Sequence, residues 1–130
     1  MARRAGAILA VADVERSVEF YRDRLGFEVE ARYDDPPYAT LSLAASRLSL
    51  AEQGHDAEDR PGVAMTAPAD PSEANVVIVV EVDDARREYA RLAQAGTEFL
   101  AEPYEPAWGG CRFFCIDPDG YLVEIEQPAP

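Results

Sequence analysis

The sequence predicts an α+β domain that is built from two similar βαβββ modules. An apolar run, an acidic cap, an amphipathic helix and a glycine follow one another twice, and each glycine precedes three segments with strand character. Chance periodicity would reproduce one such element more easily than the whole order. The aligned positions are Asp13 with Asp84, Val11 with Val82, Val18 with Tyr89, Tyr21 with Leu92 and, after a shift of one residue, Gly26 with Gly96.

The first module opens with residues 5–11, an apolar run that predicts a strand buried on both faces. Asp13 then offers an N-cap oxygen for a helix, and Gly26 lies where a left-handed residue ends one. The helix carries its apolar side chains at helical spacing, which predicts one buried face. These side chains are Val14, Val18, Tyr21 and Leu25.

Three strands complete the first module. Residues 27–31 alternate between apolar and polar side chains, and residues 34–37 form a proline-containing turn. Residues 38–43 and 47–52 then predict a hairpin around residues 44–46.

The second module repeats this order from residue 75 onward. The valine-rich run 75–82 predicts a strand, and Asp84 caps a helix whose apolar face carries Ala85, Tyr89 and Leu92. Three further strands are predicted over 97–101, 111–116 and 121–126. The turn 117–120 has the sequence Asp-Pro-Asp-Gly, in which proline sets the first dihedral angle and glycine accepts a positive φ.

The modules are expected to form one domain over residues 1–130. Module 1 covers about 4–53, module 2 covers about 74–127, and the proline-containing segment 54–73 links them. This linker is long enough to cross over a binding site as a flap.

Composition limits the possible partners. The formal net charge is −13, from 25 acidic and 12 basic residues, and every basic residue is arginine. Such a surface repels nucleic acid and anionic lipid and attracts cations. The alternative is that the charge only keeps the protein soluble. No apolar run approaches the roughly 20 residues that cross a bilayer, and the short start at residues 1–12 is interpreted as a strand rather than a signal peptide. We therefore expect a cytoplasmic protein without nucleic-acid or membrane partners.

The two cysteines are expected to be thiols rather than a disulfide. Cys111 and Cys115 lie four residues apart in a predicted strand, which separates their Cα atoms by roughly 13 Å, beyond the ~7 Å that a disulfide spans. Neither has the C-x-x-C spacing of a redox or zinc site.

Three segments resemble the vicinal oxygen chelate superfamily, which includes glyoxalase I, extradiol dioxygenases, fosfomycin-resistance enzymes and bleomycin-resistance proteins. Residues 11–27, VADVERSVEFYRDRLGF, resemble its first helix, and Trp108-Gly109-Gly110 together with residues 117–125, DPDGYLVEI, resemble its closing strand pair. The resemblance covers nearly the whole chain. It implies two modules whose mixed sheets curl into a cup, paired in a homodimer.

The same resemblance identifies four strand positions where metal-dependent members carry histidine, glutamate or glutamine ligands. Here these positions are occupied by Gly6, Ser49, Val77 and Glu124, and only Glu124 has a suitable side chain. The single histidine, His55, falls in the linker. We therefore expect no metal and no other cofactor. A site built from oxygens alone is an open alternative, and it would use Glu52, Glu81, Glu124 or Glu126.

The sequence also lacks the parts of other reactive sites. It has no lysine for a Schiff base, no glycine-rich phosphate loop and no second histidine. A thiolate at Cys111 or Cys115 would have only Arg112 nearby to lower its pKa. No catalytic residue is predicted.

Aromatic and polar side chains define the predicted ligand site instead. Strand alternation places Arg112, Phe114 and Ile116 on one face and Phe113 with the cysteines on the other, without deciding which face meets the helix. Packing in the core is the alternative for Phe113, and a solvent-facing pair with Arg112 is the alternative for Glu124. The predicted ligand-binding residues are Tyr38, Thr40, Ser42, Ser49, Tyr104, Trp108, Phe113 and Glu124.

Planar or cationic ligands suit aromatic walls above carboxylates. The resemblance to bleomycin-resistance proteins implies a non-catalytic protein that sequesters an aromatic or cationic natural product or antibiotic. The alternative is a metal-dependent lyase, isomerase or dioxygenase with an unforeseen ligand set. A third possibility is an inert or regulatory domain that binds a metabolite or a partner protein.

Overall fold

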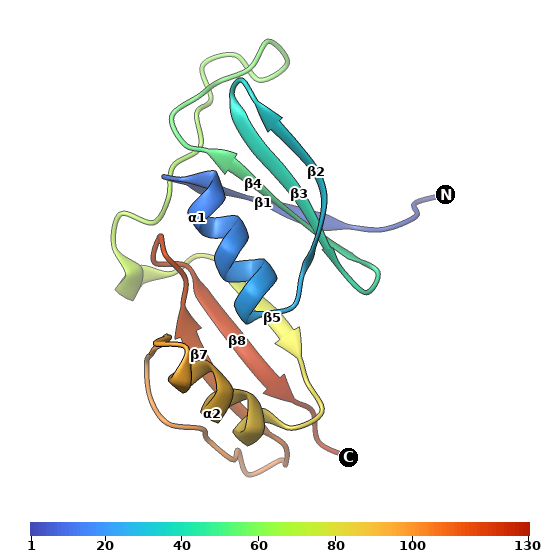
Figure 1. Cartoon of the computed structure of the whole chain (residues 1–130), viewed down its shortest axis with the longest axis vertical. Coiled ribbons are helices and arrows are strands. Elements are labelled where there is room, and N and C mark those ends of the chain that lie inside the picture. The colour runs from blue at the N-terminus through green and yellow to red at the C-terminus, as the bar shows by residue number, and fades with distance from the viewer. The chain divides into compact units, whose positions relative to one another are not determined.

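The computed structural model describes all residues, 1–130, and divides the chain into two units. Unit 1 covers Met1–Ala69 and unit 2 covers Asp70–Pro130. Each unit is an open four-stranded mixed sheet with a helix packed on one face (Figure 1). No helix in the chain has the length and apolar character that crossing a bilayer requires.

The two sheets have the same topology. In unit 1 the order is β1-β4-β3-β2, and the strands span Gly6–Val11, Ser46–Glu52, Pro37–Leu43 and Glu28–Asp34. In unit 2 the order is β5-β8-β7-β6, with strands Val77–Glu81, Leu122–Gln127, Cys111–Ile116 and Glu98–Phe99. Both sheets pair their first strand in parallel with their last and contain only antiparallel pairs otherwise. This confirms the predicted repetition of a βαβββ module.

Capping residues set the helices as the sequence predicted. Asp13 accepts a hydrogen bond from the backbone N–H of Arg16 and begins α1, Val14–Glu19. Asp84 does the same through the N–H of Arg87 and begins α2, Ala85–Gln94. Gly26 and Gly96 follow the helical segments with φ of 82° and 81°, the left-handed region that favours glycine.

The first helix departs from the prediction in its second half. From Phe20 to Arg24 it continues as a wider π-helical turn instead of an α-helix. Tyr21 lies within this turn, fully buried and edge-to-face with both Phe20 and Phe27. The predicted apolar face is nevertheless buried throughout, because Val14, Val18, Tyr21 and Leu25 all lie in the core.

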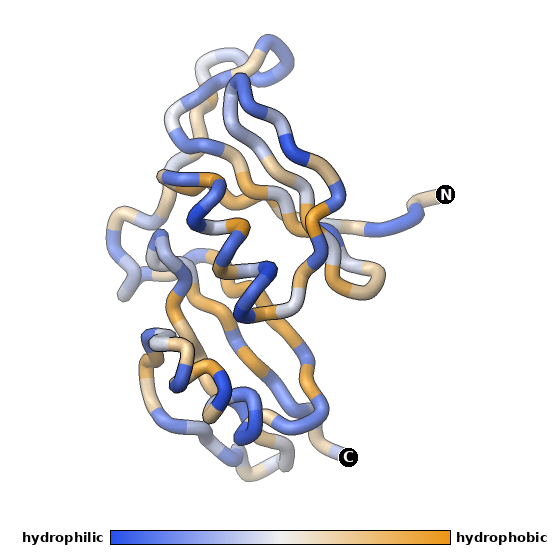
Figure 2. Tube along the Cα trace, in the orientation of Figure 1, coloured by the Kyte–Doolittle hydropathy of each residue, from blue (hydrophilic) through white to orange (hydrophobic).

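The core of each unit lies between its helix and its sheet. Helix α1 packs on β3 and β4, where Ala39, Leu41, Leu48 and Leu50 are buried. Helix α2 packs on β7 and β8. Along α1 in Figure 2, hydrophilic and hydrophobic positions alternate as expected for a helix with one buried face.

Several predicted strands differ from the observed ones. Strand β2 continues to Asp34 instead of ending at residue 31, and β5 spans Val77–Glu81 instead of 75–82. The first half of β1, residues 6–8, is exposed rather than buried on both faces, because β1 is an edge strand that has a neighbour on one side only. Strand β6 has two residues instead of the predicted five, since the chain bends from Leu100 onward, ahead of Pro103. In the turn 117–120, one carboxylate oxygen of Asp117 accepts the N–H groups of Asp119 and Tyr121, which confirms the predicted turn.

The segment after β4 belongs to unit 1 as far as Ala69. Within it, the N–H of Gly54 donates to the carbonyl of Met65, and the side chain of Gln53 accepts the N–H of Ala67. These bonds close the segment into a loop on its own unit. The flap function of this segment stays a prediction.

Candidate functional site

Each sheet has one face that its own helix covers and an opposite face, here called the open face. The predicted ligand-binding residues divide between the two units, and each group is described within its own unit. Unit 1 carries Tyr38, Thr40, Ser42 and Ser49, and unit 2 carries Tyr104, Trp108, Phe113 and Glu124.

In unit 1, an arginine organises the open face. The Nε of Arg47 donates to the hydroxyl of Ser49 at 3.1 Å, and its Nη2 donates to the hydroxyl of Tyr38 at 3.3 Å. Ser49 is fully buried, and its oxygen also lies 3.5 Å from the Thr40 hydroxyl. We call this cluster the polar face of unit 1; its members are Tyr38, Thr40, Ser42, Arg47 and Ser49.

Strand register explains why these side chains meet. Thr40 is opposite Ser49 and Ser42 is opposite Arg47 in the antiparallel pair of β3 and β4. Because side chains alternate along a strand, the residues between them point to the helix, where Ala39 and Leu41 are fully buried. The predicted division of β3 into a polar and a core face is therefore confirmed.

In unit 2, aromatic rings surround a second arginine. The guanidinium carbon of Arg112 lies 6.0 Å from the ring centroid of Tyr104, 5.9 Å from that of Trp108 and 5.7 Å from that of Phe114. Distances of this size allow cation–π attraction. Tyr104 is held beside Arg112 by two backbone hydrogen bonds, of 2.8 and 2.9 Å.

Two glutamates complete this surface. Phe114 is opposite Glu124 and Arg112 is opposite Glu126 in the pair of β7 and β8. An Nη1 of Arg112 lies 3.5 Å from a carboxylate oxygen of Glu124. We call the set the aromatic–acidic face of unit 2; its members are Tyr104, Trp108, Arg112, Phe114, Glu124 and Glu126.

Glu124 is the most buried of the carboxylates on this face, at 9% exposed. Burial raises its pKa above the ordinary value, because the charged form loses its water. A hydrogen bond with Glu126 and the negative charge of that neighbour raise the pKa further, whereas Arg112 opposes the rise. Glu124 and Glu126 therefore form a carboxyl pair that gains from a nearby positive charge.

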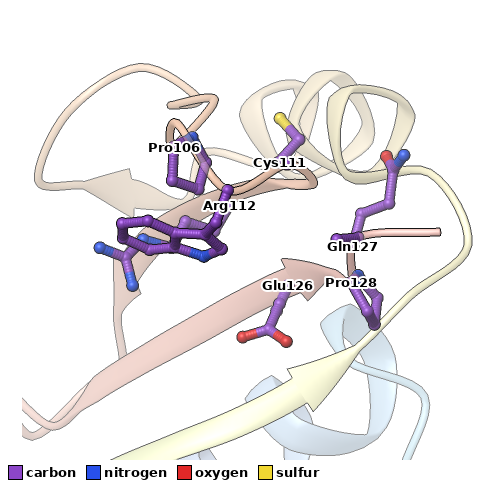
Figure 3. A pocket seen from close by; sticks show the side chains of 9 residues that line it. Pro106, Cys111, Arg112, Glu126, Gln127 and Pro128 are labelled. Carbon is purple, nitrogen blue, oxygen red and sulfur yellow. The ribbon is translucent and has the colours of Figure 1, made fainter.

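A small pocket of unit 2 opens beside this face (Figure 3). Arg112 and Glu126 enter it from neighbouring strands, and Pro106, Trp108 and Pro128 enter it from loops. Its volume of about 150 Å³ is below the range typical of pockets that enclose a drug-sized molecule. Within unit 2 alone, such a ligand would be covered only in part.

The structure places Phe113 in the core, which is the alternative that the sequence left open for this residue. Phe113 is 2% exposed and packs edge-to-face against Tyr89 of α2 and Phe99 of β6, so it belongs to the core. Phe114 takes its place beside Glu124. Alternation separated the two rings correctly, but only the position of α2 decides which of them is buried. Trp108, in contrast, is 73% exposed in its loop, as a ligand wall requires.

Sequence reasoning missed Arg47 and gave Arg112 only the part of a partner for Glu124. Arg47 precedes Ser49, a predicted site residue on the same strand face, by two positions. Arg112 precedes Phe114 by two positions, but Phe114 was not a predicted site residue. That spacing was the available signal.

The four positions that the resemblance assigns to metal ligands do not fit a metal ion. In unit 1, a side chain at Gly6 would collide with Arg47, and the hydroxyl of Ser49 is occupied by the same arginine. In unit 2, Val77 has no ligating atom, and Glu124 is paired with Arg112. Neither unit brings three histidine, cysteine, aspartate or glutamate side chains together. The expected absence of a metal stays a prediction.

The remaining candidates, His55 and the two cysteines, belong to neither face as defined above. His55 is exposed in the loop after β4, with its Nε2 2.7 Å from the carboxylate of Glu52. Cys111 and Cys115 are buried in unit 2 and form no disulfide with each other. Figure 3 shows Cys111 and Gln127 extending toward α2, where the Gln127 amide accepts the N–H of Ala85.

Comparison with known proteins gives the same fold over the whole chain. The sequence profile of the Glyoxalase/Bleomycin resistance protein/Dioxygenase superfamily matches residues 4–125. An ethylmalonyl-CoA/methylmalonyl-CoA epimerase of Cereibacter sphaeroides is 31% identical, with 92% of each chain covered.

Two solved structures are similar throughout. TnmS3, an antibiotic binding protein from Streptomyces sp. CB03234, has a TM-score of 0.73 at 20% identity, with 99% of this chain and 98% of that one covered. TioX from Micromonospora sp. ML1 has a TM-score of 0.75 at 19% identity, with 97% and 98% covered. At these identities the likeness establishes the fold.

Proposed function

This chain belongs to the Glyoxalase/Bleomycin resistance protein/Dioxygenase superfamily, and we propose that it is a non-catalytic protein that binds a planar aromatic or cationic natural product. The proposal places the ligand on the aromatic–acidic face of unit 2. One precedent is TnmS3, an antibiotic binding protein of similar fold.

The observation that carries the proposal is the stacking of Trp108 on Arg112. One side of the indole already attracts a planar cation, the guanidinium at 5.9 Å, while the side chain is 73% exposed. An exposed indole is a large, rigid stacking surface, and each cation–π contact contributes about 0.5 to 2 kcal/mol. A planar ligand would extend the stack that Arg112 and Trp108 begin.

Charge favours a cation over an anion at this face. Arg112 supplies one positive charge, whereas Glu81, Glu124 and Glu126 place three carboxyl groups on the same open face of neighbouring strands. The pKa of Glu124 is raised chiefly by burial and by Glu126. A bound cation would compensate both carboxylates, and this gain is larger in a partly buried setting than in open water.

Tryptophan fluorescence tests the proposal directly, because Trp108 is the only tryptophan of the chain. The full chain is titrated with bleomycin, mitomycin C and the planar cation proflavine. We expect saturable quenching by at least one of them. The substitution Glu124→Gln should weaken binding of the charged ligands about tenfold, since it removes a partly buried charge partner.

The matched control is Glu88→Gln on α2, which changes the net charge by the same amount on the helix side of the sheet. It should bind as the unaltered chain does. If none of the three compounds quenches Trp108, or if both glutamine variants weaken binding equally, the proposed function is wrong.

We propose a homodimer as the working assembly and the cytoplasm as its location, as expected from the sequence. Light scattering on the purified chain tests the first proposal, since a dimer has twice the 14.3 kDa mass of one chain. Fractionation of the producing cells tests the second. A mass in solution equal to that of one chain would contradict the dimer. Recovery of the protein outside the cytoplasm would contradict the proposed location.

A further inference from the structure

We propose that the polar face of unit 1 holds a separate binding site for an oxyanion, a carboxylate or phosphate group, with Arg47 as its central donor. This site lies in the other unit from the proposed natural-product site. The two sites can therefore be tested independently of each other.

The guanidinium of Arg47 has N–H groups that are not used by its contacts with Ser49 and Tyr38. A guanidinium carries five N–H donors, of which the contacts with Ser49 and Tyr38 use two. Both acceptors are neutral hydroxyls, and no carboxylate lies within ion-pair distance of Arg47. Its positive charge is thus oriented by hydrogen bonds but not neutralised by a direct partner. Such a group is prepared for a bidentate contact with a planar or tetrahedral anion.

The other nearby cation is already used. Arg4 makes two hydrogen bonds to the carboxylate of Glu30, of 3.0 and 2.7 Å. These bonds are also the main reason why the pKa of Glu30 lies below its ordinary value. The charge of Arg47 also lowers the pKa of Glu30, as a smaller cause than Arg4. Glu30 is therefore the acid with which a bound anion would compete, and its ion pair is with Arg4. More distant carboxylates are screened over about 8 Å at physiological salt.

A pocket of unit 1 lies beside Arg47, at a point where two strands approach closely. Gly6 of β1 lies directly against Arg47, and a Cβ at this position would come within 2.5 Å of the Arg47 carbonyl oxygen and 2.8 Å of its Cβ. A pocket of about 220 Å³ opens here in unit 1, at the edge strand. Its lining consists of Arg4, Ala5, Gly6, Ala7, Ile8 and Arg47. The volume accommodates a carboxylate or phosphate group but not a drug-sized molecule.

Neutral hydroxyl groups broaden the site. The hydroxyls of Tyr38 and Ser49 already contact the guanidinium, and Thr40 continues the network from Ser49. A hydroxyl can rotate its hydrogen toward an anion. Arg47 would then supply the charge and the direction, and Tyr38 would contribute an additional donor.

The test is an NMR titration of the full ¹⁵N-labelled chain with sodium phosphate and, separately, with sodium benzoate at constant ionic strength. We expect saturable shifts of the Arg47 Nε–H signal and of the amides of Tyr38 and Ser49 with at least one anion. The tighter of the two anions identifies the ligand class. Arg47→Gln should weaken binding at least tenfold, and Arg47→Lys should retain part of it, because lysine keeps the charge but loses the bidentate geometry.

Arg32→Gln is the matched control, since Arg32 pairs with Glu15 of α1 on the covered side of the same sheet. It should leave the affinity unchanged. The proposal is overturned if neither anion gives saturable shifts, if Arg47→Gln binds as well as the unaltered chain, or if Arg32→Gln weakens binding as much as Arg47→Gln. Quenching of Trp108 in unit 2 by proflavine is measured on the same variants in a parallel titration, so that loss of either site is recognised separately.

Discussion

The guanidinium of Arg112 lies 3.5 Å from the carboxylate of Glu124, yet the pKa of Glu124 is raised. Burial and the adjacent Glu126 outweigh the arginine. The charged form of Glu124 is therefore disfavoured despite its ion pair with Arg112. A cation bound beside Glu124 and Glu126 would favour their charged forms, which is the effect expected of the proposed cationic ligand.

The raised pKa of Glu124 predicts how the stability of the protein depends on pH. The folded protein holds the proton of Glu124 more tightly than the unfolded chain does, so the free energy of unfolding falls as pH rises from the unfolded pKa, about 4.3, through the raised folded pKa. Glu124→Gln removes this loss. Its stability relative to the unaltered chain should therefore increase across that window and level off above it. Urea unfolding between pH 3 and 8 measures the difference.

Glu81→Gln serves as the control for this pH series, because Glu81 is an exposed glutamate on the neighbouring strand β5. It should show no comparable gain as pH rises. A relative stability of Glu124→Gln that is flat or falls with pH would mean that Arg112 dominates the ionisation of Glu124.

The adjacent phenylalanines of β7 are predicted to behave oppositely. Phe113→Ala opens a cavity among Tyr89 and Phe99 and should lower the free energy of unfolding by about 3 to 5 kcal/mol. Phe114→Ala, on the open face, should cost less than about 1.5 kcal/mol and should instead weaken the binding of planar ligands. Urea unfolding and Trp108 quenching give the two readouts. Equal destabilisation by both variants would contradict the assignment of faces.

Phe113 and Phe114 also show which features the sequence can predict and which it cannot. Alternation with a period of two places Phe113 and Phe114 on opposite faces whatever the tertiary structure is. Which face is buried depends on the side to which α2 returns, and that is set by long-range packing. In unit 1, the polar triplet of β3 contained the missing information, because Ala39 and Leu41 had to be the core side.

The same distinction between local and long-range contacts applies to other features. The caps at Asp13 and Asp84 act through bonds three residues away, so the sequence was sufficient to predict them. The network of Arg47 joins β3 to β4 and depends on strand register. The π-helical turn at Phe20–Arg24 carried no recognised sequence signal.

The caps themselves allow a quantitative check of the module repeat. Asp13→Ala and Asp84→Ala each remove one side-chain hydrogen bond to a helix N–H. Each should lower the free energy of unfolding by about 1 kcal/mol. Asp13→Asn and Asp84→Asn retain a capping oxygen and should recover most of the loss. Thermal or urea unfolding followed by circular dichroism measures all four, and failure of the asparagine variants to recover stability would contradict capping as the cause.

The lack of a fitting metal site gives a final prediction. Arg47 occupies the surroundings of Gly6 and Ser49, and Arg112 occupies Glu124, so a divalent cation would have to displace a guanidinium in either unit. We expect substoichiometric metal in the purified chain by elemental analysis, and no shift of the unfolding midpoint after addition of manganese, iron, nickel or zinc. Stoichiometric metal that disappears in Glu124→Gln, with turnover abolished by chelation, would instead favour the lyase, isomerase or dioxygenase alternative. The same measurement on Arg112→Gln is informative, because removing the competing cation should be the change that first allows Glu124 to bind a metal ion.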